Sequence, residues 1–149
     1  MQQLAVIRLN IDRFRPLNEY LSNNGGDELL RQVAQRLRIT NAEALIVAHL
    51  NGDDFAIVYE ISHIRPSIEE HCERITKAFN LPFNVQGQEH IITLSMGVSL
   101  YPEHGRQLDY LNNCAEQALS EAKRLGGNTI KYYDLDNSKL LEQDVHLER

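Results

Sequence analysis

The chain has 149 residues, 42% of them hydrophobic, and a formal net charge of −6, which is typical of one soluble globular domain. The negative charge argues against a general nucleic-acid coat, and no apolar run approaches the roughly 20 residues that span a bilayer. Because the first residues also lack a signal-peptide pattern, we expect a cytoplasmic domain that contacts neither nucleic acid nor membrane. A membrane-anchored parent protein is compatible with this composition.

The first half of the chain alternates strands with helices. An apolar, β-branched run predicts a buried strand, and apolar residues recurring at a spacing of four predict a helix. Asn51-Gly52 is a strong hairpin signal because both turn positions favour positive φ. In chain order we expect a strand at residues 4–9, a loop at 10–16, a short helix, a turn at 23–26, a helix at 27–38, a strand at 44–50 and a returning strand at 55–59.

The second half repeats this alternation and defines the fold class. We expect a helix that begins near Pro66, a hairpin formed by residues 83–85 and 91–100, a helix at 108–122 and a strand at 129–133. Since two adjacent pairs of strands form hairpins, the sequence predicts an α+β sandwich with a mixed, mainly antiparallel sheet.

The ends of the domain and its two cysteines complete this description. The predicted domain covers residues 1–133, and residues 134–149 are expected to form a linker helix towards a missing domain. Cys72 and Cys114 lie in helical patterns, where a buried free thiol behaves as a small hydrophobic group.

Three loops carry polar residues suited to a nucleotide. Residues 10–15 follow a buried strand and precede a helix, where backbone N–H groups can hold phosphate. Asp53 and Asp54 at the hairpin tip suit a hard cation such as Mg²⁺, and Lys123-Arg124 could meet a phosphate. Taken singly, each loop has an ordinary explanation as a solvated turn, a solvated loop or a complement to a helix dipole. The six histidines show no metal-ligand spacing.

Six sequence blocks in this order resemble the GGDEF family of diguanylate cyclases. They match the family patterns D-x-D-x-F-K-x-(I/V)-N-D, G-D-x-x-L, G-G-D-E-F, S-x-G-(I/V)-(A/S), A-D-x-A-L and A-K-x-x-G-R-N. The resemblance implies a fold like that of nucleotidyl cyclases and polymerase palms, in which two domains, each holding one GTP, face each other and form cyclic diguanylate. The matching blocks are residues 10–19, 26–30, 51–55, 95–99, 115–119 and 122–128.

The resemblance also implies roles for individual residues. A carboxylate that accepts hydrogen bonds from the base is a device for guanine specificity, and a divalent cation would neutralise the triphosphate. The resemblance assigns guanine binding to Asn18 and Asp27, phosphate binding to the amides of Arg13, Phe14 and Arg15 and to Lys123, catalysis to Asp53 and Asp54, and Mg²⁺ or Mn²⁺ ligation to Asp53, Asn10 and the carbonyl of Ile11.

The sequence departs from the family pattern mainly at the metal and phosphate positions. Asn10 replaces the first metal-binding Asp and brings no negative charge, Asn51 replaces the first motif glycine, and Gly127 replaces an Arg that would hold the terminal phosphate. Asp54 is one methylene shorter than the usual Glu. The R-x-x-D product-inhibition motif is absent, because residues 42–45 stand in its place.

The preferred hypothesis is a degenerate GGDEF domain that binds GTP, or dimerises, as a regulatory module of a GGDEF–EAL protein. Its partner would be a second copy of the domain or an intramolecular EAL domain, and the parent protein could be a cyclic di-GMP phosphodiesterase. One alternative is an active cyclase in which Asp12 and Asp53 hold one metal, although Asp12 is expected to face away from Asn10. Another alternative is an interaction module that binds no nucleotide.

Overall fold

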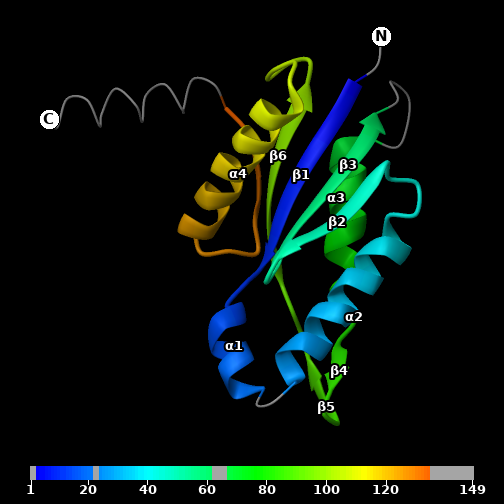
Figure 1. Ribbon diagram of the computed structural model, residues 1–149, viewed down its shortest axis with the longest axis vertical. Coiled ribbons are helices and arrows are strands. Elements are labelled where there is room, and N and C mark those ends of the chain that lie inside the picture. The colour runs from blue at the N-terminus through cyan, green and yellow to red at the C-terminus, as the bar shows by residue number, and fades with distance from the viewer. Residues whose placement is uncertain (1–2, 22–23, 62–66, 135–149) are drawn as a thin grey trace, which may run out of the picture.

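The computed structural model describes residues 3–21, 24–61 and 67–134 (Figure 1). In chain order its elements are β1 (Gln3–Ile11), α1 (Phe14–Tyr20), α2 (Gly25–Thr40), β2 (Ile46–Asn51), β3 (Asp54–Ile61), α3 (Ile68–Ala78), β4 (Phe83–Val85), β5 (Gln88–His90), β6 (Leu94–Tyr101), α4 (Leu108–Arg124) and β7 (Ile130–Tyr132).

Five of the strands form one central sheet in the order β2-β3-β1-β6-β7. All neighbouring pairs are antiparallel except β6 and β7, which are parallel. Helix α4 packs on one face of the sheet, and α2 and α3 lie on the other (Figure 1). The predicted α+β sandwich with a mixed, mainly antiparallel sheet is therefore confirmed.

The residues of β1 alternate between the two faces of the sheet, as a period of two requires. Ile7 and Leu9 are fully buried in the larger core, which includes apolar residues of α2 and α3. Val6 belongs to a smaller cluster with Leu111 and Ala115 of α4. A continuous apolar run thus marks a central strand covered on both faces.

The expected hairpin of residues 83–85 with 91–100 is wrong. Strand β4 pairs with β5 in a separate two-stranded sheet, and β6 pairs with β1 and β7 in the central sheet. Gln86 (φ 54°) and Gly87 (φ 79°) make the tight turn between β4 and β5, as two positive φ values do in a two-residue hairpin. The three residues of β5 are polar, so the sequence pattern does not reveal them as a strand.

Three predicted boundaries also change. The turn between β2 and β3 lies one residue later than predicted, because Asn51 pairs with Asp54 and only Gly52 of the predicted Asn51-Gly52 turn has positive φ. Helix α2 begins at Gly25, inside the expected turn. Helix α3 begins after Ser67 with a capping box.

Further sequence predictions concern the C-terminal linker, the two cysteines and membrane-spanning helices. Pro66 and residues 135–149 of the predicted linker helix lie outside the described residues, so the domain boundary stays a prediction. Cys72 and Cys114 are buried free thiols, as expected. Within the described ranges, no helix combines the length and apolar character needed to cross a bilayer.

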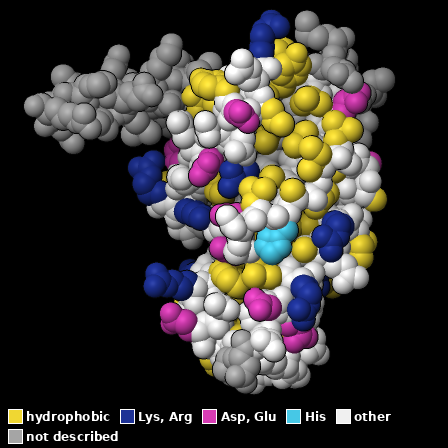
Figure 2. Space-filling model, viewed as in Figure 1, with side chains coloured by type: hydrophobic (Ala, Val, Ile, Leu, Met, Phe, Trp, Pro, Cys, Tyr) yellow, Lys and Arg dark blue, Asp and Glu magenta, His cyan; other side chains and the backbone are white. Residues whose placement is uncertain are grey.

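One part of the sheet face beside α4 remains exposed. Ile46 of β2 pairs with Val58 of β3, and Ala48 pairs with Ala56. Val58 belongs to the cluster under α4, so this column of residues lies on the same face. Figure 2 shows hydrophobic side chains gathered on this face to the right of α4, and Ile46 is 47% exposed.

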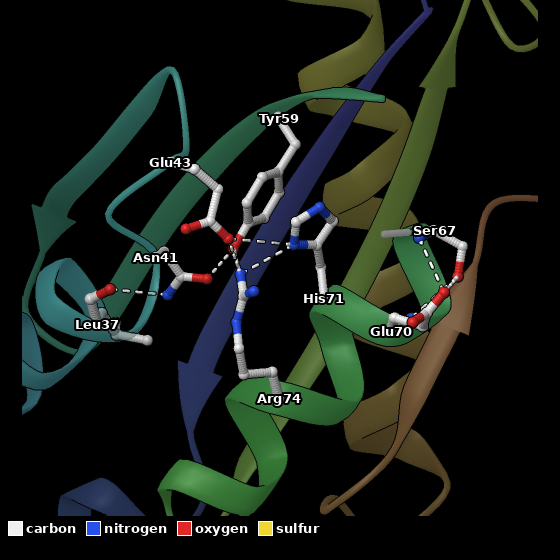
Figure 3. Close-up of polar contacts among 8 residues, drawn as sticks. All are labelled: Leu37, Asn41, Glu43, Tyr59, Ser67, Glu70, His71 and Arg74. Atoms are coloured by element: carbon white, nitrogen blue, oxygen red, sulfur yellow. Dashed lines mark hydrogen bonds and ion pairs between the residues drawn. The ribbon is translucent and has the colours of Figure 1, made fainter. Parts of the chain in front are cut away.

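A buried polar cluster connects α2, β3 and α3 on the opposite face (Figure 3). Tyr59 donates its hydroxyl hydrogen to Asn41 Oδ1, and Asn41 Nδ2 donates to Leu37 O at 2.7 Å, at the end of α2. The His71 ring stacks on the Tyr59 ring with centroids 3.8 Å apart. Because burial raises the pKa of Tyr59 to about 12, its hydroxyl stays a donor at neutral pH.

Arg74 completes this cluster at its exposed side. Its guanidinium pairs with Glu43, donates to the Tyr59 hydroxyl at 3.3 Å and lies 2.9 Å from His71 Nδ1. Since Arg can only donate, Nδ1 accepts this hydrogen bond and the imidazole is held in its neutral form. Sequence reasoning missed this cluster, whose members come from three separate stretches of the chain.

The neutral His71 makes the stability of the domain depend on pH. Burial lowers the pKa of His71, and the charge of Arg74 lowers it further, while Glu43 and Glu70 act in the opposite direction. The unfolded state therefore takes up more protons below the ordinary His pKa of about 6.5, and the free energy of unfolding falls as the pH drops. Urea unfolding at about pH 7.5 and pH 5.5 measures this loss of stability. The lower pH is chosen because it lies above the ordinary pKa values of aspartate and glutamate side chains.

The variant His71→Phe is the control, because phenylalanine keeps a ring against Tyr59 and has no titratable group. Its free energy of unfolding should change less between the two pH values than that of the unchanged protein. An equal change in both proteins would contradict the role given to His71.

Candidate nucleotide-binding site

The end of β1 meets the tip of the β2–β3 hairpin, where four of the predicted site residues come together. Asn10 pairs with Asp54 across the two strands. Its Nδ2 atom donates to Asp54 Oδ1 at 2.6 Å and to the backbone oxygen of Asp53 at 3.3 Å. The backbone N–H of Ile11 donates to the same Asp53 oxygen at 3.4 Å. These contacts hold the hairpin tip against β1.

The donor set at this place does not fit a divalent cation as it stands. The Asp54 carboxylate and the Asp53 carbonyl are both acceptors, so the Asn10 amide must present its nitrogen to them. Cation ligation requires the amide oxygen instead, because Mg²⁺ takes oxygen ligands. Among the described residues, no group of three His, Cys, Asp or Glu side chains could hold a metal ion.

The environment of Asp53 contains groups that raise its pKa and groups that lower it. Burial raises the pKa of Asp53, and repulsion from Asp54 adds to this, while Lys123 and the Asn10 amide act to lower it. Lys123 lies in the last turn of α4, so the fold brings the predicted phosphate-binding lysine to the hairpin tip. The net shift identifies Asp53 as a carboxylate whose charge is incompletely compensated.

The expectation that Asp12 faces away from Asn10 is wrong. Asp12 Oδ1 accepts a hydrogen bond from Ser95 Oγ at 2.5 Å, and Ser95 is the cross-strand partner of Asn10. Residues two apart on an extended segment share one face, which is the physical reason for the correction. Asp12 Oδ2 accepts from Thr93 Oγ1 at 2.5 Å and from the backbone N–H of Asn128 at 2.7 Å.

These bonds also explain the glycine at position 127. Gly127 has φ +80°, and a Cβ atom there would lie 2.8 Å from Asp12 Oδ1. An arginine at this position would need both a rarely adopted backbone conformation and a displaced Asp12. Asp12 therefore holds the loop after α4 in place. Sequence reasoning missed Thr93 as one of its partners.

The predicted guanine-binding residues come from two adjacent helices. Asn18 lies on α1 and Asp27 in the first turn of α2, and both are exposed. A Cβ atom on Gly26 would overlap Asn18 Oδ1, so the glycine lets the Asn18 side chain lie against the start of α2. The fold thus places an amide and a carboxylate near the same helix end.

The predicted phosphate-binding residues lie where the chain leaves β1. Arg13 has φ 54°, in the left-handed region, and precedes the first residue of α1. This conformation turns the chain so that the amides of Phe14 and Arg15 stand in the first turn of α1, where N–H groups have no partner within the helix. Both arginine side chains are exposed.

The hairpin tip has a further support that sequence reasoning missed. His49 Nε2 lies 2.5 Å from Gly52 O, and its ring stacks on Phe55 with centroids 4.5 Å apart. Phe55 is buried. The turn that carries Asp53 and Asp54 is thereby tied to the core.

The sequence model of the family described as diguanylate cyclase, GGDEF domain, matches residues 1–129. The chain belongs to the GGDEF domain family. The chain is 30% identical over 147 residues to the cyclic di-GMP phosphodiesterase NbdA of Pseudomonas aeruginosa, a match that covers 97% of this chain and 18% of that protein. It is 28% identical over 148 residues to the diguanylate cyclase TpbB of the same species, covering 99% of this chain and 34% of TpbB.

Solved GGDEF domains share the fold. The GGDEF domain of TpbB from Pseudomonas aeruginosa superposes with a TM-score of 0.83 at 28% identity, covering 95% of this chain and 83% of that chain. The active GGEEF domain of a diguanylate cyclase from Vibrio cholerae gives a TM-score of 0.77 at 27% identity, covering 89% and 84%. The chain spans only 18% to 34% of the curated relatives NbdA and TpbB, which are longer proteins. It is thus a GGDEF domain of cyclic di-GMP signalling, with the palm-like fold of that family.

Proposed function

We propose that this GGDEF domain binds GTP as a regulatory module of a larger cyclic di-GMP signalling protein and has little or no cyclase activity. The observation that carries the proposal is the 2.6 Å hydrogen bond from Asn10 Nδ2 to Asp54 Oδ1. Phosphoryl transfer between two nucleotides needs a cation to neutralise the triphosphate and activate the attacking hydroxyl. An uncharged amide that donates to a carboxylate supplies neither.

The parts that would bind the nucleotide are better preserved than the parts that would turn it over. The Asn18 amide offers both a donor and an acceptor to the edge of a guanine, and the Asp27 carboxylate offers acceptors. Gly26 lets Asn18 lie against the start of the helix that carries Asp27. Lys123 is close enough to act on the charge of Asp53 and would meet phosphate at the same end of the sheet. Mg²⁺ or Mn²⁺, which the family generally uses in catalysis, would accompany GTP through the phosphates rather than through Asn10.

A GTP-binding module of this kind would act on a second copy of the domain or on an EAL domain of the same protein. The names of two relatives support the second route. NbdA is a cyclic di-GMP phosphodiesterase, and MucR of Pseudomonas aeruginosa is a bifunctional diguanylate cyclase and phosphodiesterase. In this proposal the domain lies in the cytoplasm.

A turnover assay tests the absence of cyclase activity. Because the cation site lacks its charged ligand, GTP supplied with Mg²⁺ or Mn²⁺ to a dimerising form of the protein should yield no more cyclic di-GMP than the Asp53→Ala variant does, within about twofold. The product is measured by chromatography. Robust product formation that is lost in Asp53→Ala would establish the alternative of an active cyclase.

The contacts of Asp12 bear on the alternative of an active cyclase. Asp12 shares the face of Asn10, which would favour an active site built from Asp12 and Asp53. Its carboxylate oxygens, however, accept hydrogen bonds from Ser95, Thr93 and the backbone N–H of Asn128.

The alternative of an interaction module that binds no nucleotide is tested by calorimetric titration with GTP. No heat, together with no effect of Asn18→Ala or Asp27→Ala, would favour it.

A further inference from the structure

We infer that the Asn10 side-chain amide takes the place of a protein-bound divalent cation at the hairpin tip, so that this domain needs no Mg²⁺ to bind GTP. The inference rests on the proposed GTP binding and deepens it, because it states which group organises the site. At the hairpin tip Asn10 presents an N–H donor, whereas a divalent cation of the kind that the family uses requires oxygen ligands.

The contact between Asn10 and Asp54 is too short to contain a cation. Two oxygen ligands at about 2.1 Å from Mg²⁺ lie about 3 Å apart in an octahedral shell, whereas Asn10 Nδ2 and Asp54 Oδ1 are 2.6 Å apart. A direct charge-assisted hydrogen bond accounts for this distance. Asn10 is only 6% exposed, so solvent does not compete strongly for the amide.

The same amide links the two residues that a cation would link. One N–H reaches the Asp54 carboxylate and the other reaches the Asp53 backbone oxygen. The Ile11 N–H adds a second donor to that oxygen. The hairpin tip is therefore fixed to β1 by hydrogen bonds alone, and a nucleotide meets a site that is already assembled.

Positive side chains of the protein can also balance negative charge at the hairpin tip and on the phosphates. Lys123 of α4 acts on Asp53, and the exposed Arg13 and Arg15 lie at the start of α1. In the proposed mode of binding, these three side chains would meet the charge of the phosphates. A cation would still bind GTP in solution, but the protein would gain no ligand from it.

The substitution Asn10→Asp reverses this arrangement. An Asp at position 10 would lose both hydrogen bonds and place a third carboxylate beside Asp53 and Asp54. Like charges at this distance repel in the partly buried site, so the variant should need a cation to bridge them. Asn10→Ala is the matched control, because it removes the amide without adding a charge.

Thermal unfolding of the ligand-free proteins provides the first readout. In EDTA, Asn10→Asp should lower the melting temperature by about 5 °C, and millimolar Mg²⁺ should restore at least half of that loss. Mg²⁺ should shift neither the unchanged protein nor Asn10→Ala by more than about 1 °C. A rise in the melting temperature of the unchanged protein with Mg²⁺, similar to that of Asn10→Asp, would overturn the inference.

Calorimetric titration with GTP provides the second readout. The dissociation constant of the unchanged protein should differ by less than about twofold between EDTA and Mg²⁺, and Asn10→Asp should bind at least about tenfold more tightly with Mg²⁺ than without it. Binding by the unchanged protein only in Mg²⁺ would overturn the inference and leave the proposed GTP binding intact. Binding in neither buffer would overturn the proposed function and this inference with it.

Discussion

Replacement of Gly97 by alanine is expected to lower the free energy of unfolding by about 3 kcal/mol and the melting temperature by roughly 10 °C. Gly97 lies in the middle of β6, opposite Arg8 of β1, on the face that α4 covers. A Cβ atom at this position would collide with the backbone oxygen of Ala115 and the backbone nitrogen of Leu119. Neither atom can rotate away, because both belong to the hydrogen-bonded interior of α4, so the whole helix would have to move off the sheet.

The matched control is Gly105→Ala. There the nearest atom to an added Cβ is Tyr110 Cδ2, at 2.6 Å, and a side chain can rotate where a helix backbone cannot. The expected loss is below about 1 kcal/mol. Urea unfolding followed by circular dichroism measures both variants. If Gly97→Ala unfolded within about 0.5 kcal/mol of the unchanged protein, the close packing of α4 on β6 would not be a requirement of the fold.

The substitution Asn41→Ala is expected to cost about 3 kcal/mol of stability. Asn41 is 1% exposed, and its amide donates to Leu37 O at the end of α2 while its oxygen accepts from Tyr59. Removal of the side chain would leave Leu37 O without this donor and would leave the Tyr59 hydroxyl with no acceptor among these contacts. Two buried polar groups would thus lose a partner in one step.

Asn80→Ala is the control for this substitution, because Asn80 also follows the end of a helix but is exposed. Its expected effect is within about 0.5 kcal/mol. The variant Tyr59→Phe should fall between the two, since it removes the hydroxyl but keeps the ring that stacks on His71. Chemical unfolding gives the three values, and equal losses for Asn41→Ala and Asn80→Ala would show that the buried cluster does not stabilise the fold.

Elements with a strong apolar period were predictable, and partners between distant segments were not. The run in β1 and the spacing of Leu29, Val33 and Leu37 in α2 were sufficient to identify those elements. The hairpin prediction for β6 failed because an apolar alternation shows that a segment is a strand but not which strand it pairs with. Strand β5 was missed because its three residues are polar.

The candidate site shows the same division. The order of the motif blocks predicted that Asn10, Asp53 and Asp54 belong to one site, and the structure brings them together, with Lys123 near Asp53. The face of Asp12 was predicted wrongly, although the period of an extended segment was sufficient to derive it. The link from Asn41 to Tyr59 and His71 depends on how α2 and α3 dock on the sheet, which no local pattern contains.

The exposed column of Ile46, Ala48 and Ala56 has a consequence for any measurement of self-association. Apolar side chains on an open sheet face attract one another at high protein concentration, whether or not a nucleotide is present. A dimer seen by gel filtration or light scattering can therefore arise from this face rather than from two nucleotide sites facing each other. Nucleotide-driven pairing is recognised by its dependence on GTP at constant protein concentration, whereas adhesion through the sheet follows protein concentration and added detergent.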